Sequence, residues 1–235
     1  MIVRPATRQD NTSLMEIDFS PIVDNWRFLA SGLMMTLLLS ACVVAGSLTL
    51  GFAVGLARYY GPRWLALLLT FYVDSMRAIP VLVVLVWTFF AFPILTGSGL
   101  PPFWAALVAL TIHIAAYVAE IVRAGIASVR AGQTRAALAL GMSQSQLIAK
   151  IILPQAVVRM LPAFGSILSI TIKDTAIATV IAVPELMRQS ETIAAQSFRP
   201  MEVFTFAMIV YFLMLFPVTR GVDMLYRRVA HLGRS

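Results

Sequence analysis

The chain has 235 residues, of which 60% are hydrophobic and only 12% are charged, and its mean hydropathy is +0.86. Soluble domains carry about 25% charged residues, so this composition excludes an ordinary water-soluble fold. The formal charge of +7 does not indicate a nucleic-acid binder, because the arginines lie at the ends of apolar runs and not on a soluble face. We therefore expect membrane lipid, and no nucleic acid, among the partners of the chain.

We expect no cleavable signal peptide at the N-terminus, because residues 1–26 contain Asp10, Glu16, Asp18 and Asp24 and no continuous apolar segment. We expect an extracytoplasmic segment over 1–26, a transmembrane domain over 27–228 and a cytoplasmic tail over 229–235. Cys42 is the only cysteine, which excludes an intrachain disulfide and a thiolate cluster, and we expect no metal site.

Three apolar runs contain no charged residue: 28–57, 100–119 and 203–219. Each approaches or exceeds the length needed to cross a hydrocarbon core of about 30 Å, which takes about 20 helical residues. Two further runs are interrupted by charges. The run 64–95 holds Asp74 and Arg77, and the run 161–184 holds Lys173 and Asp174. The sequence therefore predicts an all-α, polytopic membrane helix bundle with about five transmembrane helices.

The distribution of Lys and Arg predicts how this bundle is oriented. Basic residues gather in the turn 58–63, in the long link after Glu120 and in the C-terminal tail. The turn 96–102 has none, and 185–202 has two arginines against three glutamates. The positive-inside rule places the three basic stretches in the cytoplasm. Five spans then leave the N-terminus outside and the C-terminus inside.

The link over 124–160 contains the most informative segment, GQTRAALALGMSQSQLIAKIILP, at 132–154. It predicts two short helices, the first of which covers 134–140 and ends at Gly141 as a C-cap. Ser143 with Gln146 three residues later is typical of a capping box that starts the second helix. Pro154 should interrupt or close that helix, because it has no N–H group.

The first helix of this link has a small surface made by Ala136, Ala137 and Ala139. A short helix of this kind fits the groove of a partner protein. An amphipathic helix that rests on the bilayer surface is the alternative. The residues alone favour neither.

Several motifs, in order, resemble the membrane subunits of ATP-binding-cassette (ABC) importers, and in particular the polar amino acid branch of the MetI-like permeases. The link resembles the cytoplasmic coupling loop of that family, although Arg135 stands where the family has its characteristic Glu. The matching residues are Gly132-Gln133, Ala136-Ala137, Ala139-Leu140-Gly141, 152–156, Ala116-Tyr117, Glu120-Ile121, Arg123, Gly125-Ile126, Lys173-Asp174-Thr175, 183–186 and 198–200, with Met76-Arg77-Ala78-Ile79-Pro80 close to a further signature.

This resemblance implies the fold of a type I importer in the bacterial inner membrane. Two permease subunits, identical or paralogous, would enclose the path, a cytoplasmic ABC ATPase dimer would hold their coupling loops, and a periplasmic solute-binding protein would deliver the substrate. ATP and Mg would be bound by the ATPase. The chain contains no Gly-Lys pair and hence no P-loop, so we expect no cofactor, no catalytic residue and no enzymatic activity in it. The run 77–80 is similar to that of glutamate/aspartate permeases.

Three groups of candidate site residues follow. Ser166, Ser169 and Lys173 are spaced as one helical stripe, and with Asp174 and Thr175 they would line a path for a zwitterion, Lys173 meeting the carboxylate and Asp174 the amine. A structural Lys173–Asp174 ion pair is the alternative. The expected coupling residues are Gly132, Gln133, Arg135, Ala136, Ala137, Gly141 and Pro154, and the possible gate comprises Arg77, Pro80 and Glu120.

The gate residues also have non-functional interpretations. Arg77 would pair with Asp74 at the membrane interface, and Glu120 and Arg123 would snorkel to it. Two other functions compete with the importer. An ion-gradient-driven secondary transporter would show internal repeats with paired broken helices, and no repeated motif joins the two interrupted runs. An intramembrane hydrolase would have to use His113, which has no carboxylate at helical spacing on its run.

Overall fold

The computed structural model describes residues 17–229, and in that part of the chain it contains helices and turns but no strand. The expected segments at 1–16 and 230–235 lie outside the described residues. In chain order the elements are α1 (Ser20–Asp24), α2 (Trp26–Tyr60), α3 (Arg63–Ala78), α4 (Val81–Val86), η2 (Trp87–Ala91), α5 (Phe92–Thr96), α6 (Pro102–Ala127), α7 (Ala131–Ala139), α8 (Gln144–Leu147), η3 (Ile148–Ile152), α9 (Leu153–Asp174), η4 (Thr175–Ile181), α10 (Leu186–Ser197) and α11 (Pro200–Val229).

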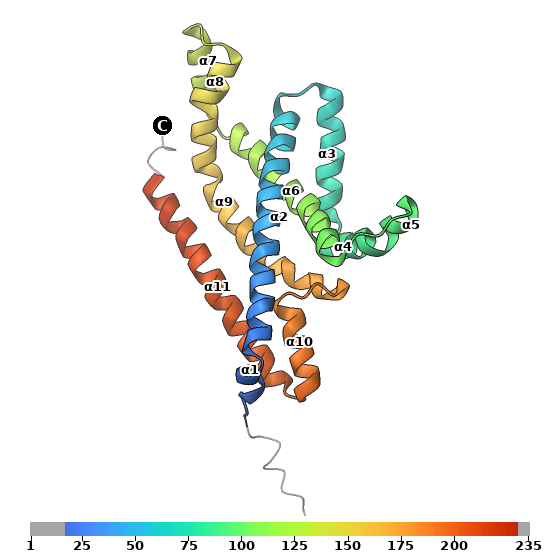
Figure 1. Ribbon diagram of the computed structural model, residues 1–235. Helices are drawn as coiled ribbons and strands as arrows, with labels where there is room; N and C mark the ends of the chain where they lie inside the picture. Colours follow the sequence, from blue (N-terminus) through green and yellow to red (C-terminus); the bar gives the residue numbers. More distant parts are fainter. Residues whose placement is uncertain (1–16, 230–235) are drawn as a thin grey trace, which may run out of the picture.

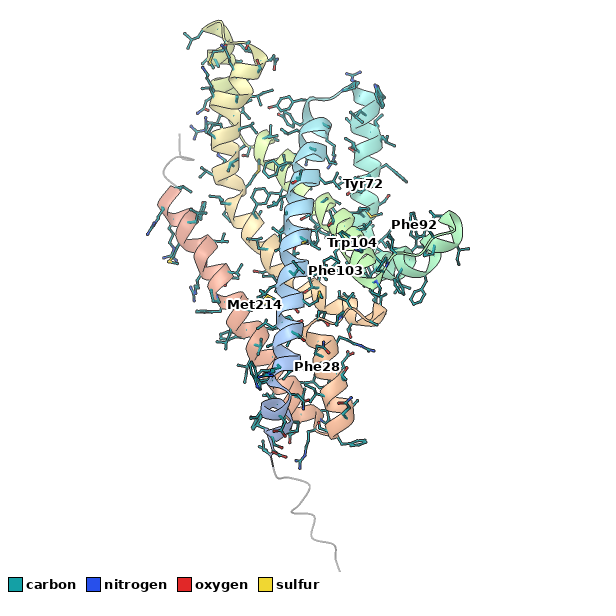
Figure 2. All side chains as sticks on the ribbon, viewed as in Figure 1. Phe28, Tyr72, Phe92, Phe103, Trp104 and Met214 are labelled. Atoms are coloured by element: carbon teal, nitrogen blue, oxygen red, sulfur yellow. The ribbon has the colours of Figure 1, made fainter. Side chains whose placement is uncertain are left out.

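Four stretches of the described chain are long and apolar enough to cross a membrane: α2, α6, the run Gln144–Ile181 that contains α9, and α11. A fifth candidate is the pair formed by α3 and the helix over 81–96, which are bent by 106° at Ile79 and Pro80. Ile79 is extended, as the residue before a proline tends to be. The prediction of about five spans is confirmed, with the second span broken. Exposed side chains on these helices are mostly apolar (Figure 2), as on α3, where Trp64 and Phe71 are 68% and 72% exposed.

The centre of the bundle is the contact between α2 and α6. Gly51 and Gly55 lie one helical turn apart and let the two backbones approach closely. A methyl group at Gly51 would lie 2.5 Å from Cβ of Val118, and one at Gly55 would lie 2.7 Å from Cβ of Val122. Two small residues four positions apart are a common device for packing membrane helices.

The ends of the helices agree with the predicted charge pattern. Figure 1 shows the α2–α3 turn, the α7–α8 segment and the C-terminal end of α11 toward one end of the molecule, and α1 and α10 at the other. The three basic stretches therefore share one end. The α7–α8 segment extends beyond the other helices there (Figure 1).

One expectation is corrected in the second half of the chain. Lys173 and Asp174 do not lie in the middle of a regular span, because α9 ends at Asp174 and continues as the 3-10 helix η4. The stretch 185–202, which the charge distribution predicts to lie outside, packs against the bundle as a helix. It contains α10, whose buried residues recur with helical spacing and pack against α2 and α11.

Candidate functional site

The α7–α8 hairpin (residues 131–147) is built from two capping motifs. Gly141 adopts a left-handed conformation with φ 76°, which suits glycine. Its N–H donates to Leu138 O over 3.0 Å, and the Met142 N–H donates to Ala137 O over 3.1 Å. This pair of bonds is a Schellman motif, and it confirms Gly141 as the end of the first helix.

The second helix begins as predicted and does not end as predicted. The Ser143 hydroxyl accepts from the Gln146 N–H, and the Gln146 side chain accepts from the Ser143 N–H, which completes a capping box. Pro154 does not close the helix. The chain forms a π-helical turn, η3, and Pro154 lies in the first turn of α9, where a missing N–H costs little. Helical structure therefore runs from the hairpin into the bundle over Gln144–Ile181.

The exposed face of α7 differs from the predicted one. Ala137 is only 5% exposed and packs into the hydrophobic core. Gly132, Ala136 and Ala139 are exposed and lie at positions i, i+4 and i+7 of one helix face. Beside them are the exposed Arg135 and also Leu140, which is 83% exposed and which the sequence analysis did not single out. The structure therefore has an exposed surface of small residues on α7, but it contains Gly132 instead of Ala137.

Two side chains brace this hairpin against the bundle. Gln155 of α9 donates from Nε2 to Gln133 Oε1 over 2.5 Å and to Ile151 O over 3.0 Å. Gln133, a predicted coupling residue, therefore joins the hairpin to α9.

Three of the five predicted path residues line one cavity. Ser166, Ser169 and Lys173 of α9 line a space of about 420 Å³ with Thr219 and Asp223 of α11. The two serine hydroxyls donate to carbonyl groups of α9 itself. Their acceptor lone pairs are therefore the groups that remain for a solute.

Asp174 and Thr175 do not line this cavity. Thr175 is fully buried, and its hydroxyl donates to Ile172 O over 2.7 Å. The acidic residue that shares the cavity with Lys173 is instead Asp223, fifty residues later in the sequence. Its position in the C-terminal basic stretch gave no signal of this role.

The predicted gate residues do not form one unit. Arg77 stacks on Tyr117, with 5.7 Å between its guanidinium carbon and the ring centroid. Glu120 bonds to Arg58 over 2.8 Å and to Arg123 over 2.6 Å. Among the described residues no ion pair joins Arg77 to Asp74. Glu120 therefore joins α2 and α6 instead of snorkelling, and Pro80 marks the bend between α3 and α4.

His113 does not have the surroundings of a catalytic base. It is 5% exposed, lies against Tyr117 with ring centroids 5.4 Å apart, and its Nδ1 has no hydrogen-bond partner within residues 17–229. A base that activates a nucleophile is normally oriented by a third group through that nitrogen. The described part of the chain thus gives the hydrolase alternative no support.

Comparison with known proteins shows the family to which the chain is similar. The model of the family described as "Binding-protein-dependent transport system inner membrane component" matches residues 47–231. The glutamine transport system permease protein GlnP of Escherichia coli (strain K12) is 36% identical over 92% of this chain and 99% of its own. The arginine transport system permease protein ArtQ of Bacillus subtilis (strain 168) is 33% identical over 87% of this chain and 94% of its own. These relatives give no support to an ion-gradient-driven transporter.

Solved structures agree with this match. A structure described as an amino acid ABC transporter with histidines has a TM-score of 0.85 and 33% identity, and it covers 91% of this chain and 100% of the other. An inward-facing structure of the MetNI methionine ABC transporter has a TM-score of 0.76 at 20% identity, over 88% of this chain and 98% of the other, and it shows the shared fold.

Proposed function

The chain belongs to the family of binding-protein-dependent transport system inner membrane components, and from that premise we propose that it is the permease subunit of an ATP-driven importer of polar amino acids. The observation that carries this proposal is the capped α7–α8 hairpin, which extends beyond the bundle (Figure 1). From the hairpin, helical structure continues over Gln144–Ile181, which includes the Lys173 side of the cavity. The names of the relatives, which transport glutamine and arginine, support the substrate class.

In this proposal a cytoplasmic ATPase dimer holds the hairpin and binds ATP and Mg. The exposed face of Gly132, Ala136 and Ala139 contacts the ATPase, because these side chains let another backbone approach closely. Closure of the ATPase dimer moves the hairpin, and helix α9 carries that motion to the cavity. A second permease, identical or paralogous, completes the path, and a periplasmic binding protein delivers the solute. The N-terminus lies outside and the C-terminus inside.

The cavity between α9 and α11 supports a zwitterionic substrate. Lys173 offers an ammonium group to a carboxylate, and Asp223 offers a carboxylate to an amino group. A volume of about 420 Å³ is at the lower end of the range of small-molecule sites. The narrower expectation of glutamate or aspartate is supported by the run 77–80, and uptake competition among labelled amino acids tests it.

Co-purification with the ATPase chain tests the coupling surface. We expect Ala136→Trp to lose the ATPase, because an indole on the small face prevents close approach. The matched control is Ala149→Trp. Ala149 is also exposed but lies in η3, nearer the bundle, so this variant should keep the ATPase. If the Ala136→Trp permease reaches the membrane and still retains the ATPase as the control does, the hairpin is not the docking surface.

A further inference from the structure

With the N-terminus outside, as proposed, the spacing of charges on α11 places helix α10 within the outer half of the membrane. Helix α11 is free of charge over 203–219, between Glu202 and Arg220, a length of about 25 Å at 1.5 Å per residue. The Tyr211 hydroxyl donates to the Glu185 carboxylate over 3.1 Å. Tyr211 is about 16 Å along α11 from Pro200, so α10 begins near the middle of the bilayer and ends at its outer surface.

One face of α10 is held firmly by the bundle. The Leu186 N–H donates to the Thr36 hydroxyl of α2 over 3.0 Å, and the Glu185 carboxylate caps the helix by accepting from the Met187 and Arg188 N–H groups. Gln189 packs on Gly32, where a methyl group would lie 2.6 Å from Gln189 Cγ. The depth and rotation of α10 are therefore fixed.

The other face of α10 is partly exposed and mainly polar. Arg188 and Gln196 are exposed, Glu191 and Thr192 are half-buried, and all four lie on one helical stripe that also includes the exposed Ala195. The side chains of Arg188 and Glu191 are 45% and 36% exposed, and their charged atoms are 3.7 Å apart. The Thr179 hydroxyl of η4 donates to Glu191 over 2.7 Å. This contact orients the Glu191 carboxylate, while most guanidinium donors of Arg188 remain available.

This polar face differs from the exposed surface of α11 at the same depth. On α11, Met208 and Phe212 are 65% and 60% exposed, and both are apolar. A charged side chain within the hydrocarbon core costs about 2.5–3.5 kcal/mol by insertion scales, and such residues normally face a water-filled space. The stripe on α10 therefore does not face lipid.

We propose that the exposed face of α10 lines the water-filled outer entrance of the solute path, and that Arg188 and Glu191 meet the carboxylate and the ammonium group of an entering α-amino acid. The second part rests on the proposed function. The planar guanidinium of Arg188 suits bidentate contact with a carboxylate. This site lies on the segment predicted to be outside and is separate from the Lys173 cavity.

Cysteine labelling tests the entrance. In the assembled transporter with Cys42→Ser, which removes the only cysteine of this chain, Thr192→Cys or Gln196→Cys is treated from outside with a membrane-impermeant, cationic methanethiosulfonate. We expect labelling at least tenfold faster than at the control Met208→Cys, because the reactive thiolate forms in water. Equal rates would overturn the proposal, since lipid or a partner would then cover the stripe. Labelling requires neither ATP nor solute, so its result is independent of the proposed function.

Uptake tests the ion pair. In proteoliposomes with the binding protein and labelled glutamine, Arg188→Gln and Glu191→Gln should each lower the initial rate at least fivefold at subsaturating solute, and Glu191→Asp should recover part of it. The control is Met208→Ala on α11, which removes no charge and lies outside the stripe. Unchanged rates in both charge-removing variants would overturn the role of the pair, whatever the labelling shows.

Discussion

The Tyr211 hydroxyl of α11 lies 3.1 Å from the Glu185 carboxylate at the start of α10, and this bond joins the buried end of α10 to the middle of α11. Glu185 is fully buried. Its two other hydrogen bonds go to the first N–H groups of α10. Tyr211, in the middle of α11, thus anchors the start of α10, the polar helix that precedes α11 in the chain.

Loss of this bond should lower stability moderately. Tyr211→Phe removes one donor and keeps the ring, so we expect a loss of about 0.5–1.5 kcal/mol in the free energy of unfolding. The melting temperature of the purified permease should fall by about 2–4 °C per kcal/mol. Tyr226→Phe, on the exposed C-terminal part of α11, is the control and should melt like the unmodified chain. Equal melting of all three proteins would show that the bond contributes nothing.

The contact of α2 with α6 should not tolerate a single methyl group. Gly51→Ala places Cβ against Val118 and 2.8 Å from Ala115 O, and we expect a loss of about 1–3 kcal/mol from overpacking. Gly221→Ala, where nothing lies within 4 Å, should stabilise helix α11 by about 0.5–1 kcal/mol. Denaturant titration in mixed micelles measures both. Similar effects of the two substitutions would contradict the close-packing account.

The Glu120 carboxylate should be required for stability, because it neutralises Arg58, whose side chain is only 7% exposed. Glu120→Gln leaves that charge buried, and we expect a loss of about 3 kcal/mol, at the lower end for a broken buried pair because Glu120 is itself 24% exposed. Arg58→Met in the same chain should recover most of it. A double-mutant cycle by thermal unfolding measures the coupling, and additive effects would refute it.

The positive charge of Lys173 should be required for uptake. Lys173→Met removes a charge-assisted hydrogen bond to the solute worth about 1.5–3 kcal/mol, so the initial rate should fall about tenfold to a hundredfold. Lys173→Arg, which keeps the charge, should retain more activity. Uptake of labelled glutamine by proteoliposomes measures this against the amount of permease inserted. An unchanged rate in Lys173→Met would remove the cavity from the path.

The features predicted correctly are those that depend on local sequence. The apolar runs, the helix end at Gly141 and the Ser143 capping box each rest on a few neighbouring residues. The features missed depend on contacts between distant segments. Asp223 joins the Lys173 cavity only because α11 runs beside α9, and Ala137 is buried because α7 packs against α8 and η3. The depth of α10 follows from its contacts with α2 and α11, among them the hydrogen bond from Tyr211.

The most direct test of the account is glutamine uptake by the complete transporter in proteoliposomes, with ATP supplied on the hairpin side and ionophores present. We predict that uptake continues when ion gradients are collapsed, stops when ATP is omitted and stops when the ATPase is inactivated. Uptake that persists without ATP and follows an imposed ion gradient would contradict it.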